Sequence, residues 1–255
     1  MTSIDQPMVD EKGCARLELN GAFNFRDLGG YVTKDGNTLR TGLLFRSDDL
    51  WRLDDSDISQ IVKLHLKSVI DLRSENEVTT RGFFPVNKFP VDYINISLAD
   101  VSADPELARD NKEYLFDRYK EILATSQEKI ALVITHLAEQ NNLPAVFHCA
   151  AGKDRTGLIA ALVLGVVGVD DETIIMDYSK TTSAMEAFSA WLKKEHPDIA
   201  SIISEMPPVL FSSEPNTMKQ TLDWLTKKFG SPEKYLLSSG VTGSTITQLR
   251  ETLLM

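Results

Sequence analysis

A single stretch near the middle of the chain constrains the fold most. Residues 145–148 are apolar and end in a histidine, residues 149–153 are small or polar, and an apolar run follows from Leu158 to Val169. This order predicts a short buried strand, a tight loop and a helix that is buried on every side. A buried strand that leads directly into a helix is typical of α/β folds.

The composition is that of an ordinary globular protein, with 42% hydrophobic and 25% charged residues. A chain of 255 residues suits one sizeable α/β domain. We expect a flexible arm at residues 1–15 and a single domain over residues 16–255. The arm lacks the basic and apolar regions of a signal peptide, and the longest apolar run is too short to span a membrane. The expectation is therefore a cytoplasmic protein with no transmembrane segment.

Charge and metal-binding residue types exclude several other functions. The chain has 37 acidic and 27 basic residues, and this formal net charge of −10 argues against nucleic acid as a partner. The four histidines show no metal-ligand spacing, so we expect neither a metal nor another cofactor. Cys14 lies in a polar stretch and is interpreted as incidental, with a redox partnership to Cys149 as the alternative. Nothing in the sequence indicates an oligomeric state.

The predicted loop has the properties of an anion-binding site. Backbone N–H groups at a helix N-terminus bind phosphate, and small residues allow successive N–H groups to converge. Arg155, at the junction of loop and helix, can hold two phosphate oxygens with one planar guanidinium. The expected phosphate ligands are Ala150, Ala151, Gly152, Lys153, Asp154 and Arg155.

Cys149, at the start of this loop, is the candidate nucleophile. A helix N-terminus and neighbouring cations favour the thiolate form of a cysteine. We therefore predict a thiolate that attacks phosphorus and forms a cysteinyl-phosphate, while the loop donors stabilise the transition state. The Thr156 hydroxyl is placed to hydrogen-bond the sulfur when water cleaves this intermediate.

The leaving group of a phosphoester also needs a proton. Asp154, inside the loop, is the favoured general acid. Asp100 and Asp104 remain alternatives, because they follow an apparent strand at residues 91–98 and can lie on a loop near the site. Asp104, followed by a proline, also predicts the start of a helix that runs to about Leu123.

Three further residues are candidates for supporting roles. His148 adjoins the nucleophile, and we favour a hydrogen bond that orients the loop over acid–base work. Asp71 and Arg73 end a predicted buried strand, at the sheet edge where ligands bind in open α/β folds. Contact with substrate, bracing of the cysteine loop and a simple structural ion pair remain open for this pair.

Several of these segments resemble a known group of enzymes. The spacing Cys149-x5-Arg155 resembles the signature of protein tyrosine phosphatases and their dual-specificity relatives. The longer motif at residues 148–157 resembles an atypical subgroup of bacterial and fungal tyrosine/serine and phosphoinositide phosphatases, as do residues 25–30 and 71–73, which occur in the same order.

The resemblance implies a fold and a chemistry. The fold is a protein tyrosine phosphatase-like α/β domain, with a central, mostly parallel sheet of four to five strands flanked by helices and a helical C-terminal part. Cys149 is implied as the nucleophile and Asp154 as the acid. Lys153 matches the extra basic residue of lipid-phosphatase loops, so inositol phosphates join phosphorylated proteins as expected substrates.

The expected function is that of a cysteine-dependent phosphomonoesterase. It would act on phosphotyrosine, and also on phosphoserine/threonine and phosphoinositides. The alternative is a catalytically silent phosphate-binding adaptor. A thiol oxidoreductase is disfavoured because the chain has no Cys-x-x-Cys motif and Arg155 would have no role in it.

Overall fold

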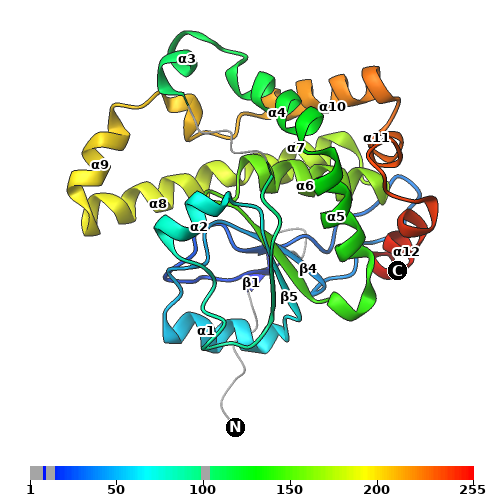
Figure 1. Cartoon of the computed structure of the whole chain (residues 1–255), viewed down its shortest axis with the longest axis horizontal. Helices are drawn as coiled ribbons and strands as arrows, with labels where there is room; N and C mark the ends of the chain where they lie inside the picture. Colours follow the sequence, from blue (N-terminus) through cyan, green and yellow to red (C-terminus); the bar gives the residue numbers. More distant parts are fainter. Residues whose placement is uncertain (1–7, 10–14, 99–103) are drawn as a thin grey trace.

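A computed structural model describes residues 8–9, 15–98 and 104–255 of the chain. These residues form one mixed sheet with helices packed around it (Figure 1). The strand order is β1-β2-β3-β4-β7-β5-β6. Asp100, one of the alternative acids, and Cys14 lie outside the described residues.

Four parallel strands form the centre of the sheet: β4 (Leu44–Ser47), β7 (Ala145–His148), β5 (Ser68–Asp71) and β6 (Asp92–Asn95). β7 lies between β4 and β5, and all four of its residues are buried. The pairing places Ser47 and Asp71 beside His148. The carboxyl ends of three strands therefore meet where the cysteine loop begins.

Three two-residue strands extend this sheet with antiparallel pairing: β3 (Arg26–Asp27), β2 (Ala15–Arg16) and β1 (Met8–Val9). With β3, the parallel strands make up the expected four- to five-stranded, mostly parallel sheet. β1 and the first residue of β2 fall within the expected arm at residues 1–15, whose flexibility stays a prediction.

Alternate strand residues face two separate hydrophobic cores, as the two-residue period of a strand requires. The larger core receives Leu44, Ile70, Ala145 and Phe147. The smaller core receives Phe45, Val69 and Val146. Both faces of β4, β5 and β7 are therefore covered, and all four residues of each of these strands are buried.

Helices that follow residue 113 in the chain cover the larger core. They are α4 (Tyr114–Thr125), α5 (Gln127–Ala138), α6 (Asp154–Val166), α7 (Asp171–Ser179), α10 (Pro215–Phe229), α11 (Pro232–Ser238) and α12 (Gly243–Leu253). α6 is buried along nearly its whole length, as the apolar run predicted. Its N-terminus follows directly from the cysteine loop.

The remaining helices complete the fold: α1 (Asp55–Ile61), α2 (Glu75–Arg81), α3 (Pro105–Asp110), α8 (Thr181–Glu195), α9 (Pro197–Ser204) and 3₁₀ turns at Val62–Leu64, Gln140–Asn142 and Pro208–Leu210. α1 contributes Ile58 and Ile61 to the smaller core. α8 and α9 extend toward the left of Figure 1.

The helix expected from Asp104 to about Leu123 is divided in two. The backbone leaves the helical region at Asn111, so α3 ends there and α4 begins at Tyr114. None of the helices in the described part of the chain is long and apolar enough to cross a membrane.

Candidate active site

Cys149 follows β7 and is 2% exposed. The loop at residues 149–153 then turns into α6, which begins at Asp154. The cysteine thus lies at the end of the central buried strand and next to a helix N-terminus, where unpaired N–H groups and the helix dipole favour an anion.

The carbonyl oxygens of residues 150–152 are all engaged on one side of the loop. The Asn24 side chain donates to the carbonyl oxygens of residues 151 and 152 at 3.1 Å, and the Arg46 guanidinium also donates to that of residue 152 at 2.7 Å. The carbonyl oxygen of residue 150 accepts from the Asp49 N–H at 3.3 Å. In a trans peptide the C=O and the following N–H point in opposite directions. The N–H groups of residues 151–153 are therefore turned to the other side, as an anion nest requires.

Gly152 is essential to this turn. Its φ is +63°, a conformation that favours glycine, and an added Cβ would lie 2.6 Å from the Asn24 amide nitrogen and the Ser47 carbonyl oxygen. The close approach of the loop to β4 therefore depends on the absence of a side chain here.

A buried ion cluster supports Arg46 behind the loop. Asp177 of α7 accepts from Arg46 at 2.5 Å and from Arg26 at 3.1 Å. Burial opposes the charged form of Asp177, but the two guanidinium groups outweigh it and hold the pKa of this carboxyl well below its usual range. Burial lowers the pKa of Arg46 to about 10, so Arg46 remains charged at neutral pH.

Arg155 is held by a partner that the sequence analysis did not single out. Its two terminal nitrogens donate to the two carboxylate oxygens of Glu77, at 2.5 and 2.8 Å. Burial of Glu77 is outweighed by Arg155, whose hydrogen bonds and charge lower the pKa of Glu77 to about 2. Glu77 is the third residue of α2 and forms a reciprocal capping box with Ser74. The pattern Ser-x-x-Glu at residues 74–77 was the available signal.

This pairing leaves part of the Arg155 guanidinium available. The group has five N–H donors. Glu77 takes one from each terminal nitrogen, and the Leu72 carbonyl oxygen lies 3.5 Å from Nη1. The Nε–H and the second Nη2–H have no hydrogen bond among the described residues. These two parallel donors form the fork that a phosphate can accept.

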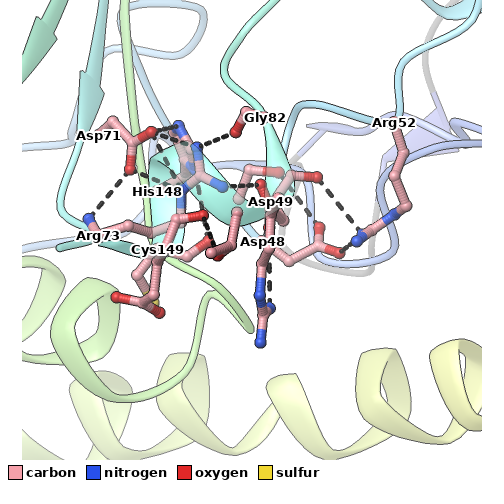
Figure 2. Close-up of polar contacts among 12 residues, drawn as sticks. Asp48, Asp49, Arg52, Asp71, Arg73, Gly82, His148 and Cys149 are labelled. Carbon is pink, nitrogen blue, oxygen red and sulfur yellow. Dashed lines mark hydrogen bonds and ion pairs between the residues drawn. The ribbon is translucent and has the colours of Figure 1, made fainter. Parts of the chain in front are cut away.

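Asp71 and Arg73 belong to a second buried ion cluster, shown in Figure 2. Arg73 is fully buried and contacts Asp71 at 2.5 Å and Asp49 at 2.8 Å. Burial of Asp71 is outweighed by His148 and Arg73, which lower the pKa of Asp71 to about 2. Because Asp49 also donates its N–H to Ala150, this cluster is connected to the cysteine loop.

His148 lies within this cluster, and its side chain is fully buried. Its Nε2 is 3.6 Å from Asp71, and its Nδ1 is 3.4 Å from the Cys149 carbonyl oxygen. Burial lowers the pKa of His148, and the neighbouring Asp71 carboxylate opposes this shift.

The two described candidates for the general acid differ in their contacts. Asp154 is the first residue of α6; its side chain is 35% exposed and accepts a hydrogen bond from Tyr119 at 2.6 Å. Asp104 instead caps α3, where one of its oxygens accepts from the N–H groups of Glu106 and Leu107.

Lys153 and Thr156 have different surroundings. The buried Lys153 ammonium donates to the carbonyl oxygen of Leu210 at 2.7 Å and lies 3.5 Å from Asp154. The Thr156 hydroxyl oxygen is buried and has no hydrogen-bond partner within the described part of the chain.

Two cavities adjoin the loop. The larger, of about 610 Å³, is bordered by residues 150–151 and by apolar side chains such as Phe188 and Trp191 of α8. The smaller, of about 100 Å³, is bordered by residues 153–155. Leu210 borders both cavities. The side chains around the larger cavity are mostly apolar, and those around the smaller one are a mixture of charged and apolar groups.

Arg52 fixes one wall of the larger cavity. Its guanidinium pairs with Asp48 at 3.1 Å, as Figure 2 shows. The same guanidinium lies 5.4–5.8 Å from the ring centroids of Phe23, Trp51, Phe188 and Trp191. These cation–π contacts hold α8 beside the loop.

No group of three or more residues of metal-binding types comes together among residues 8–9, 15–98 and 104–255. The loop and the first turn of α6 bring together Cys149, Asp154, Arg155 and the N–H groups of residues 151–153. A mostly parallel sheet with this loop at the end of its central strand defines a protein tyrosine phosphatase-like enzyme.

Comparison with known proteins leads to the same class. The profile of a family described as "Tyrosine phosphatase family" matches residues 17–255. The triple specificity protein phosphatase PtpB of Mycobacterium tuberculosis is 31% identical over 291 residues, covering 93% of this chain and 98% of that protein. A tyrosine-protein phosphatase of Nostoc commune is 32% identical over 55% of this chain and 49% of that protein. The chain belongs to the tyrosine phosphatase family, and it is a hydrolase of that type.

Similarity to solved structures is lower. The Siw14 catalytic core matches with a TM-score of 0.40 at 14% identity, over 65% of this chain and 79% of that chain. TpbA of P. aeruginosa matches with a TM-score of 0.35 at 15% identity, over 80% of this chain and 89% of that chain.

Proposed function

We propose that this phosphatase hydrolyses phosphomonoesters through a cysteinyl-phosphate on Cys149. The proposed substrates are phosphotyrosine, phosphoserine/threonine and phosphoinositides. The observation that carries the proposal is the turned loop: the carbonyls of residues 150–152 are bound on one side, which leaves the N–H groups of residues 151–153 for a phosphoryl group. The free fork of Arg155 supplies the remaining donors.

In the first step, the Cys149 sulfur attacks phosphorus, and the bond to the ester oxygen breaks. The leaving oxygen takes a proton from Asp154, which becomes a carboxylate. In the second step, Asp154 takes a proton from water, the water oxygen bonds to phosphorus, and the sulfur–phosphorus bond breaks. The unpartnered Thr156 hydroxyl supports this step, because it can donate to the departing sulfur.

The surroundings of the loop support a range of substrates. The cavity of about 610 Å³ beside residues 150–151 is lined mainly by apolar and aromatic side chains, so it can accept the aryl or acyl part of an ester. Lys153 adds a cation that a second phosphate can attract away from the Leu210 carbonyl. PtpB of M. tuberculosis, named as a triple specificity phosphatase, agrees with this breadth.

A substrate panel with excess chelator tests the range. We expect release of phosphate from phosphotyrosine peptides, phosphoserine peptides and phosphoinositide vesicles. Lys153→Met should reduce kcat/KM about tenfold more for the inositol lipids than for phosphotyrosine, because only the lipids carry additional phosphates. If the protein binds vanadate but hydrolyses none of the three, the adaptor alternative replaces this proposal. If Lys153→Met reduces kcat/KM equally for all substrates, Lys153 does not contribute to recognition of the lipids.

The role of Asp154 is tested through the leaving group. For Asp154→Asn, we expect kcat to fall about 10²–10³-fold for esters of weakly acidic phenols and less than about tenfold for activated aryl esters. The reason is that a poor leaving group depends on the proton that Asp154 supplies. The measurement is a plot of log kcat against the leaving-group pKa.

Asp104→Asn is the matched control for this experiment. Asparagine also caps helices well, so α3 should be preserved. A leaving-group-dependent loss in Asp104→Asn, with none in Asp154→Asn, would move the general acid to Asp104.

A further inference from the structure

Two buried tyrosines are linked to Asp154 by hydrogen bonds. Tyr119 belongs to α4 and Tyr178 to α7, and both are at most 1% exposed. The Tyr119 hydroxyl oxygen is 2.6 Å from Asp154 Oδ1 and 2.7 Å from the Tyr178 hydroxyl oxygen. Three helices thus contribute one continuous chain of hydrogen bonds that ends on a carboxylate in the loop.

The number of hydrogens on each group decides which group donates in each of these two hydrogen bonds. Burial, together with the negative charge of Asp154, raises the pKa of Tyr119 well above its usual value, so the phenol stays protonated. Each phenol has one hydrogen, and an ionised carboxylate has none. Tyr119 therefore donates to Asp154, and Tyr178 is left to donate to Tyr119.

The surrounding packing holds this arrangement in place. The two tyrosine rings meet edge to face, with centroids 6.2 Å apart. The first turn of α6 contacts Tyr178 at Gly157, where an added Cβ would lie 3.1 Å from the ring. The hydroxyl chain and the start of α6 are therefore fixed relative to one another.

The two oxygens of Asp154 are consequently not equivalent. Oδ1 accepts from Tyr119 and lies 3.5 Å from the Lys153 ammonium. Within the described part of the chain, Oδ2 takes part in no hydrogen bond. A transferable proton is accordingly favoured on Oδ2, because Oδ1 already receives hydrogen-bond donors.

We propose that Tyr119, supported by Tyr178, is a positioning residue that directs Asp154 Oδ2 toward the leaving group. This inference rests on the proposed role of Asp154. In the acid step the Oδ2–H bond breaks and the leaving oxygen gains the hydrogen. Tyr119 keeps its own hydrogen throughout, and Oδ1 accepts from it in both protonation states of Asp154. The carboxyl group thus keeps its orientation between the two steps.

The test compares Tyr119→Phe with wild type in the full chain. We expect kcat to fall about tenfold for aryl phosphates with poor leaving groups and less than about threefold for activated ones. The inhibition constant of inorganic phosphate should stay within about twofold, because the loop donors are untouched. Tyr178→Phe should show the same dependence on the leaving group at smaller magnitude, since it acts through Tyr119.

Tyr235→Phe is the matched control. Tyr235 of α11 is also fully buried, and its hydroxyl donates to the Leu123 carbonyl oxygen at 2.7 Å. This variant loses one buried hydroxyl without touching Asp154, so it should show no dependence on the leaving group. If Tyr119→Phe slows all substrates equally, or behaves like Tyr235→Phe, the positioning role is refuted.

A double variant separates the inference from the proposed function. In an Asp154→Asn background, Tyr119→Phe should cause no further leaving-group-dependent loss, because the proton it directs is gone. A full additional loss would refute the positioning role. If instead Asp154→Asn alone shows no leaving-group dependence, the assignment of the acid fails, whatever Tyr119→Phe does.

Discussion

Cys149→Ser is expected to reduce turnover of aryl phosphates by on the order of 10⁴-fold or more. A serine hydroxyl at this position is a much weaker nucleophile than a thiolate, and the neighbouring imidazole of His148 is held within the Asp71 cluster rather than free to act as a base. The donors of residues 151–153 and Arg155 are unchanged. Binding of phosphate analogues should therefore persist while chemistry stops.

Two measurements check this prediction. Steady-state hydrolysis of an activated aryl phosphate reports the loss of turnover, and calorimetric titration with tungstate reports whether the anion site survives. Rapid quenching of the wild type with labelled substrate should trap phosphate on the protein, and the Cys149→Ser variant should trap none. Cys14→Ser, which removes the other cysteine, serves as the control with unchanged activity. Substantial turnover in Cys149→Ser would contradict the mechanism.

The segment from β7 to α6 was predictable because its determinants are local. An apolar strand, a loop of small residues and an apolar helix follow one another within residues 145–169. Their order could therefore be predicted from this segment alone, without the rest of the sequence. The helix start at Asp104 was predictable for the same reason, since the capping side chain and the following proline are adjacent. The end of that helix at Asn111 was not, because no proline or glycine marks it.

The sequence did not predict the roles of the residues that hold the loop through its carbonyl oxygens. Asn24 and Arg46 bind the loop carbonyls from 106 or more positions away in sequence, and Asp177 neutralises Arg46 from 131 positions away. Such contacts depend on the strand order, which periodicity alone does not give. The segment at residues 25–30 was noticed only through resemblance, and the structure supplies its physical reason: Arg26 pairs with Asp177.

Glu77 was missed although a local signal for it existed. The Ser-x-x-Glu pattern at residues 74–77 predicts a helix start, and α2 begins there. The pattern does not reveal that the same carboxylate also binds Arg155, because this contact joins α2 to the cysteine loop across 78 positions. The sequence pattern explains Glu77 as part of a helix cap. Its second role, as the partner of Arg155, is visible only in the fold.

Arg155→Lys is expected to reduce kcat/KM by about 10³-fold. An ammonium group cannot pair with both oxygens of Glu77 and also present two parallel donors to phosphate. Inhibition by inorganic phosphate should weaken as well, because Arg155 acts in binding and in the transition state. Arg250→Lys is the matched control, since Arg250 pairs with Glu233 at 2.7 Å in a partly exposed pair between α12 and α11. A loss in Arg155→Lys no larger than in Arg250→Lys would exclude Arg155 from the site.

Glu77→Gln separates orientation of the guanidinium from its charge. The amide keeps the shape of Glu77 but offers one acceptor oxygen, so the fork loses its fixed angle and kcat/KM should fall about tenfold. Because the pKa of Glu77 is lowered to about 2, the wild-type pair stays ionised across pH 5–8, and this loss should be the same throughout that range. A loss confined to one end of the range would contradict the ion pair.

The same lowered pKa predicts a change in acid stability. An unfolded glutamate titrates near 4.5, so the pair stabilises the fold fully above that pH and loses this contribution as the pH falls toward about 2. Glu77→Gln should thus reduce the free energy of unfolding by about 2–3 kcal/mol at pH 7 and by much less near pH 2. Denaturant unfolding at both pH values measures the difference. An equal deficit at both would show that Glu77 acts by packing alone, and Arg155 would then need another group to hold it.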